Sequence, residues 1–139
     1  AGMRDQIAAV LGDATVLWKR RDPACDATWW VAAESTILAI DVKTGRKTVW
    51  RGLLGRQAFE PLCAAFDKES VWLGTDRGAF VYSRRHEFWS VLPLPAQAKG
   101  ARVTAIHLKD GGKAELTIQR PERRPEVITL SRSPAAAAP

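Results

Sequence analysis

The chain is poor in the residues on which most enzymes and metal sites depend. Its 139 residues include only two histidines, His86 and His107, and two cysteines, Cys25 and Cys63. Neither histidine has a partner at metal-ligand spacing, and the cysteines form no CxxC pair, so the sequence shows neither a zinc signature nor a disulfide framework. A phosphate-binding glycine loop, a nucleophile elbow and an HExxH motif are also absent. We therefore predict a protein that is not an enzyme and has no catalytic residues, no metal and no cofactor.

The few titratable candidates all have a structural interpretation that we favour. Both histidines are expected to be structural or incidental, and Asp41 and Asp76 end predicted strands, where a carboxylate commonly caps backbone N–H groups. We expect Cys25 and Cys63 to be small packing residues, with a disulfide and a reactive thiol as the alternatives.

Long apolar runs are missing as well. No segment approaches the roughly 18 apolar residues that a membrane helix needs, and a composition of 46% apolar and 26% charged residues is that of an ordinary globular protein. We predict no transmembrane segment and one soluble domain over residues 1–130, in the cytoplasm or the periplasm. Residues 131–139, rich in alanine and proline, are predicted to be a disordered tail.

A segment that occurs twice dominates what is present. Thr28-Trp-Trp-Val-Ala-Ala-Glu-Ser-Thr-Ile-Leu-Ala-Ile-Asp41 returns at an offset of 42 residues as Ser70-Val-Trp-Leu-Gly-Thr-Asp-Arg-Gly-Ala-Phe-Val-Tyr-Ser83, with Trp30 aligned to Trp72. A period of about this length, built from short β-rich runs, is typical of a four-stranded propeller blade.

Turn residues divide the chain into three strand-rich units, about residues 14–53, 59–95 and 101–130. A helix over residues 3–11 precedes them, because its apolar residues share one face and Gly12 follows. The predicted strands are residues 15–18, 28–33, 37–42, 47–50, 61–66, 70–75, 79–83, 88–92, 103–108, 114–119 and 126–130. Gly45 and Gly78 fall where a tight turn needs positive φ, and Gly74 in mid-strand predicts the close approach of a neighbour.

The apolar pattern predicts how each sheet is covered. Neither set of alternate side chains is polar in residues 29–33 and 71–74, so both faces of those sheets should be buried. Around Ala114, Leu116 and Ile118 apolar and polar residues alternate, so the third sheet should show one face to solvent. Four tryptophans are expected to fill the space between sheets: Trp30, Trp50, Trp72 and Trp89.

The second copy of the segment, residues 70–83, resembles the two-component-regulator propeller repeat, in which Trp-Ile-Gly-Thr precedes a turn glycine and an apolar strand. Ile37-Leu-Ala-Ile-Asp-Val-Lys-Thr-Gly-Arg-Lys-Thr-Val-Trp50 is similar to the quinoprotein-type repeat. The resemblance implies antiparallel four-stranded blades of β-propeller type in an all-β protein, without the quinone cofactor. Because a ring needs roughly four to eight blades, three arrangements follow: a piece of a longer propeller, self-association that completes a ring, or an open three-sheet stack.

The net charge of +6 is concentrated in residues 19–21, 84–86 and 120–124, which the pattern places in loops or at strand ends. We interpret these clusters as solvated loop charge, with an anion-binding surface as the alternative. The candidate ligand-binding residues are Trp29, Arg84, Arg85, His86, Arg120, Arg123 and Arg124.

The function that this sequence favours is a non-catalytic module for protein interaction or sensing in bacterial signalling, with a protein partner or self-association. One alternative is binding of nucleic acid or a membrane surface through the arginine-rich loops, although no nucleic-acid motif is present. The other is part of an enzyme that is completed by oligomerisation or by further chain.

Overall fold

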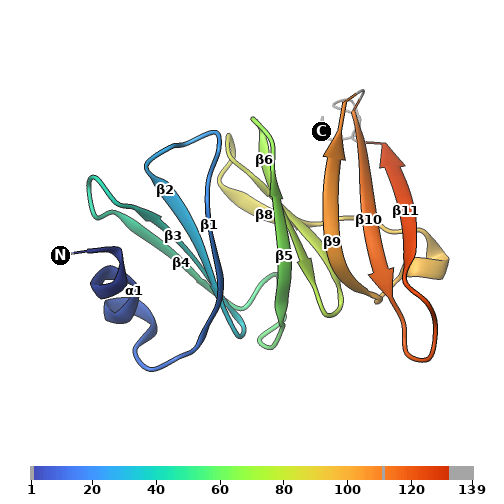
Figure 1. Ribbon diagram of the computed structural model, residues 1–139, viewed down its shortest axis with the longest axis horizontal. Helices are drawn as coiled ribbons and strands as arrows, with labels where there is room; N and C mark the ends of the chain where they lie inside the picture. Colours follow the sequence, from blue (N-terminus) through green and yellow to red (C-terminus); the bar gives the residue numbers. More distant parts are fainter. Residues whose placement is uncertain (1, 111, 132–139) are drawn as a thin grey trace. The chain divides into compact units, whose positions relative to one another are not determined.

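A computed structural model describes residues 2–110 and 112–131 and shows antiparallel sheets preceded by one short helix (Figure 1). The strands form two four-stranded sheets and one three-stranded sheet. This confirms the predicted all-β class. Of the predicted tail, Ser131 belongs to the last strand, so the tail does not begin there, and residues 132–139 lie outside the described residues. The chain divides into two compact units, Ala1–Pro61 and Leu62–Pro139, which are described separately below.

The first unit holds the helix and one sheet with the strand order β1-β2-β3-β4. Its elements are α1 (Met3–Leu11), β1 (Val16–Arg21), β2 (Thr28–Ala33), β3 (Thr36–Asp41) and β4 (Lys47–Arg51). The apolar face of α1 lies on this sheet, where Ile7 packs with Val31, Leu38 and Ile40. The helix has the bounds that its apolar spacing predicts and covers one face of the sheet.

The cations of residues 19–21 belong to β1, so the prediction that the strand ends at Trp18 is wrong. Lys19, Arg20 and Arg21 pair with Val31, Trp30 and Trp29 of β2. An edge strand tolerates such residues because their long stems cover apolar neighbours while their charged ends reach solvent. Arg21 does this with its guanidinium carbon 5.6 Å from the centre of the Trp29 ring.

The second unit holds the other two sheets, with strand orders β5-β6-β7-β8 and β11-β10-β9. The strands of the first are β5 (Pro61–Phe66), β6 (Ser70–Thr75), β7 (Gly78–Ser83) and β8 (Phe88–Val91). The strands of the second are β9 (Arg102–Lys109), β10 (Lys113–Gln119) and β11 (Glu126–Ser131), preceded by the short 3-10 helix η1 (Ala96–Ala98). In β10, Ala114, Leu116 and Ile118 are buried and the alternate residues are not, which confirms the one-sided pattern of this sheet.

The sequence repeat is a repeat of strands. The hairpins β2–β3 and β6–β7 begin and end at the same offset of 42 residues, and each closes on a two-residue turn, between Ala33 and Thr36 or between Thr75 and Gly78. Strands β2 and β6 carry buried side chains on both faces of their sheets, as predicted. Gly78 has a φ of 98°, as its place at the turn requires.

Gly74 lies where the two sheets of the second unit pack together. A Cβ atom at this position would stand 2.5 Å from Cys63 Sγ and 2.7 Å from the carbonyl oxygen of Val103, distances that real Cβ atoms do not show. Trp72, on the same face of β6, belongs to the core that joins this sheet to β9 and β10. The predicted close approach at Gly74 is therefore confirmed, and it is the backbone of β9 that approaches.

We expect Gly74→Ala to destabilise the protein by about 1–3 kcal/mol, because the added methyl group overfills a packed interface. Chemical denaturation measures the change. Adding Cys63→Ala should restore only part of the loss, since the Val103 carbonyl still obstructs the methyl group. A Gly74→Ala protein as stable as the wild type would contradict this account of the packing.

A buried carboxylate holds the tryptophan pair of the first unit. Trp30 stacks on Trp50 with ring centres 5.7 Å apart and planes 5° apart. The indole N–H of Trp30 donates to Asp22 Oδ2 at 2.9 Å, while Asp22 Oδ1 accepts from the backbone N–H of Ala24 at 2.9 Å. Asp22 is 1% exposed, and its bond to the Trp30 indole lies out of solvent. They tie the β1–β2 turn to the centre of the sheet.

Asp22→Ala should cost about 1.5–3 kcal/mol of folding free energy, the range for hydrogen bonds to a charged group, because the Trp30 N–H would lose its acceptor. Asp22→Asn is the matched variant: it keeps one of the two acceptor oxygens but turns an NH2 group toward the other N–H, so it should lose only part of the stability that Asp22→Ala loses. Thermal unfolding of the two variants against the wild type provides the measurement. An Asp22→Ala protein as stable as the wild type would show that the acceptor is unimportant.

Candidate functional site

The structure separates the two arginine-rich groups predicted from the sequence to opposite ends of the second unit (Figure 1). The Gly78 N–H donates to the Ala101 carbonyl, so the β6–β7 turn lies beside the start of β9. Gln119 pairs with Arg102, so the loop after β10 is at that same end. The turn after Ser83 lies at the other end of β7. Residues 84–86 and 120–124 therefore form no common site.

Trp29 belongs to the first unit, whereas both arginine groups belong to the second. It is half-buried in β2, where Arg21 lies over its ring. Arg21 also approaches Asp26, with its Nη1 3.7 Å from Oδ1. A cation–π contact thus occupies part of the indole surface that was predicted to stack on a ligand.

The β7–β8 turn fixes one of its three candidate residues through the backbone. Arg84 donates from Nε to the Asp67 carbonyl at 3.1 Å and from its backbone N–H to the Glu69 carbonyl at 3.0 Å. Arg85 and His86 are exposed, and the His86 ring lies 6.0 Å from that of Phe88. Arg84 therefore stabilises the turn, and its neighbours are the residues that face solvent.

The β10–β11 loop divides its arginines in a similar way. Arg120 donates to Glu126 Oε1 at 2.8 Å, and its side chain is only 19% exposed. The Gln119 side chain donates to the carbonyls of Arg120 and Arg123, which shapes the loop. Arg123 and Arg124 are exposed. Arg120 is thus engaged within the loop, whereas the other two are presented outward.

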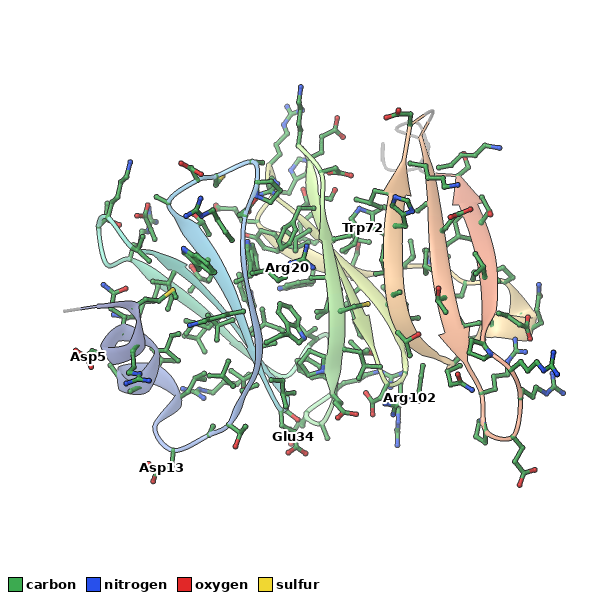
Figure 2. The ribbon with its side chains drawn as sticks, viewed as in Figure 1. Asp5, Asp13, Arg20, Glu34, Trp72 and Arg102 are labelled. Carbon is green, nitrogen blue, oxygen red and sulfur yellow. The ribbon has the colours of Figure 1, made fainter. Side chains whose placement is uncertain are left out.

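Tertiary structure adds two arginines to this end that the sequence did not single out. Arg77, in the β6–β7 turn, and Arg102, at the start of β9, are both exposed at the end that carries the β10–β11 loop. Figure 2 shows Arg102 there. Each stands alone in the sequence, so only the strand register could have revealed them. Together with Arg123 and Arg124 they form what we call the arginine end of the second unit.

The groups suited to catalysis or metal binding are dispersed. Across residues 2–110 and 112–131, no three His, Cys, Asp or Glu residues lie close enough to hold a metal ion. Asp41 accepts from the backbone N–H groups of Lys43 and Thr44, which confirms its predicted capping role. His107 is exposed beside Glu115, with Nδ1 3.9 Å from Oε1.

Neither cysteine forms a disulfide in the described part of the chain, and the two differ in environment. Cys63 is partly buried and packs against the core of the second unit, as predicted. Cys25 is exposed, so the packing role predicted for it is wrong, because it lies in the turn between β1 and β2 rather than in a strand.

Tyr82, the only tyrosine, lies beside the β7–β8 turn with its ring 5.2 Å from that of Trp89. Burial raises the pKa of its phenol above the ordinary 10.0, and the Glu87 carboxylate raises the pKa further, while Arg84 opposes them. A raised pKa stabilises the folded state fully at pH values below the unfolded pKa, and this stability is lost as pH rises through the folded pKa.

Comparison with known proteins gives a likeness of structure. No family model matches the chain, and no curated protein does. Two solved structures from B. thetaiotaomicron do, both described as the extracellular domain of BT4673, in one case as a one-component and in the other as a hybrid two-component system. The likeness is one of fold. Each has a TM-score of 0.64 and 18% identity over 78% of this chain, which spans 14% of the other chain.

Over residues 2–110 and 112–131, none of the helices has the length and apolar character needed to cross a bilayer.

Because Tyr82 is the only tyrosine, an ultraviolet titration of the folded protein reports its ionisation alone. We expect a midpoint above 10 that returns to about 10 in denaturant. Glu87→Gln should lower the folded midpoint, and Arg84→Gln should raise it, because each removes one charge acting on the phenol. A folded midpoint equal to that in denaturant, or shifts of the opposite sign, would contradict the description of this turn.

Proposed function

We propose that the chain is a non-catalytic interaction or sensory module built from blades of β-propeller type. The observation that carries the proposal is the likeness of fold to the extracellular domain of BT4673, described as part of a one- or two-component system, along 78% of the chain. In such systems an extracellular domain is the part placed to meet a signal.

The repeated hairpins support the blade interpretation. Strands β1–β4 and β5–β8 have the order of four-stranded blades, and Trp30 and Trp72 occupy equivalent buried positions in them. Strands β9–β11 are then a third blade, and residues 1–130 work as one domain. The ligand-binding loops of the proposal are the exposed turns after β7 and β10, which carry Arg85, His86, Arg123 and Arg124.

The roles of the acidic residues support a binding function over a catalytic one. Asp22 is committed to Trp30 and the β1–β2 turn, and Asp41 and Asp67 cap backbone N–H groups beside strands. These carboxylates stabilise the scaffold, which leaves recognition to the loops.

Anion binding is the second candidate function, and the arginine end favours it. Arg77, Arg102, Arg123 and Arg124 are exposed there, near Asp76 and Glu122 of the same turns. A polyanion could contact several of these guanidinium groups together, and such binding would weaken steeply with salt.

One experiment separates the proposals. The protein is incubated with heparin, with neutral oligosaccharides and with acidic peptides, and the binding of each ligand and any chemical change in the ligand are measured. An interaction module should bind one class saturably, keep that binding in about 1 M salt, where charges are screened beyond about 3 Å, and leave the ligand intact. Elution from heparin should occur at low salt.

The matched variants are Arg123→Gln with Arg124→Gln at the arginine end, and Lys43→Gln with Arg46→Gln in the exposed β3–β4 turn. Equal, small changes in heparin elution support the interaction module. A selective loss with the arginine-end pair would establish the anion-binding function instead, and release of a product would establish an enzyme.

A further inference from the structure

Strand β11 is an open edge of the third sheet. Strand β10 pairs with β9 on one side and with β11 on the other, in the order β11-β10-β9. Among the described residues no backbone hydrogen bond joins the outer side of β11 to another segment. The other two sheets have four strands each, whereas this sheet has three among the described residues.

The outer strands of the other sheets carry features that hinder pairing with another chain. Strand β1 has the cations of residues 19–21 and a register shift, and β4 begins at Lys47 and ends at Arg51. Strand β5 begins at Pro61, and β8 is only four residues long with Pro93 soon after it. Cations, proline, irregularity and short length are the usual protections of an edge strand.

Strand β9, the remaining edge, is protected by packing. It has a register shift opposite β10 and lies against β6 at Gly74. Strand β11 has fewer of these protections, and Pro125 lies directly before it rather than within it. It contains no cation and no proline, its pairing with β10 runs without a shift, and its sequence Glu-Val-Ile-Thr-Leu-Ser is rich in residues that favour strands.

The side chains of β11 continue both faces of the sheet up to the open edge. Ile128 and Leu130 are half-buried and pack against the core of the second unit. Val127 alternates with them and is 62% exposed on the solvent face. A strand added beside β11 would therefore need apolar residues in one alternate set and small or polar ones in the other.

We propose that β11 pairs antiparallel with β11 of a second copy of this chain, giving a continuous six-stranded sheet across a two-fold axis. Apolar residues that face the core alternate along β11 with residues that face solvent, which is the pattern an added strand needs. A second copy of β11 would therefore place its Ile128 and Leu130 on the same face of the sheet as Ile128 and Leu130 of the first copy. In registers centred on Ile128 or on Thr129 the lone charge of the strand, Glu126, does not face itself. Isologous two-fold pairs are also the commonest form of self-association.

The size of the contact sets the expected strength. Each copy contributes one six-residue strand and its neighbours, so the buried area falls in the range of transient interfaces, below about 1,200 Å². The dimer should therefore form reversibly and depend on concentration. The inference concerns self-association and does not rest on the proposed function.

Sedimentation velocity over a wide concentration range tests the proposal, with Val127→Lys as the disrupting variant. A lysine on an edge strand opposes pairing, and because Val127 is exposed the substitution should leave the fold intact. Val91→Lys is the matched control: Val91 is 61% exposed, close to the 62% of Val127, and lies in β8, the outer strand of a different sheet. Circular dichroism checks that both variants fold.

The wild type and Val91→Lys should shift with concentration from the 15.3 kDa monomer toward twice that mass, whereas Val127→Lys should stay monomeric. Hydrogen exchange provides a second measurement. At high concentration the amides of residues 126–131 should gain protection in the wild type and should not gain it in Val127→Lys. A wild type that stays monomeric throughout, equal behaviour of the two lysine variants, or added protection only outside β11 would overturn the proposal.

Discussion

The close approach of two sheets at Gly74 is the constraint on which the second unit depends. The Val103 carbonyl and the Cys63 thiol occupy the space that any side chain at this position would need. Because the sheets meet this closely, Trp72, Val103, Leu116 and Ile118 can form one core. That core orients the third sheet, and so it also decides which strand of that sheet packs against β6 and which is left as an edge.

Equivalent positions of a repeat need not have equivalent chemistry. Trp30 and Trp72 occupy the same place in their hairpins and are both buried. The Trp30 N–H donates to Asp22, whereas the Trp72 N–H finds no hydrogen-bond partner among the described residues. A buried donor without an acceptor costs free energy, so the repeat preserves shape and apolar burial more closely than it preserves hydrogen bonding.

Strand boundaries were predictable where turn residues bound a short apolar run, as in β2, β5 and β6. The prediction failed for β1, because a run of three cations is typical of a loop and only the pairing with β2 makes it a strand. Among the candidate site residues, the roles of Arg84 and Arg120 could not be predicted either. Arg84 is held by the Asp67 carbonyl, which is distant in the sequence, and Arg120 is held by Glu126 across a loop.

By itself the sequence determined the class of the protein, its repeated hairpin, the helix and the glycine that needs a close neighbour, because these follow from local periodicity and from steric limits at single residues. Only the tertiary structure decided that the two arginine-rich loops lie at opposite ends, that Arg77 and Arg102 join one of them, and that β11 has an open edge. These properties depend on strand order and register, which bring together residues whose positions in the sequence show no relation.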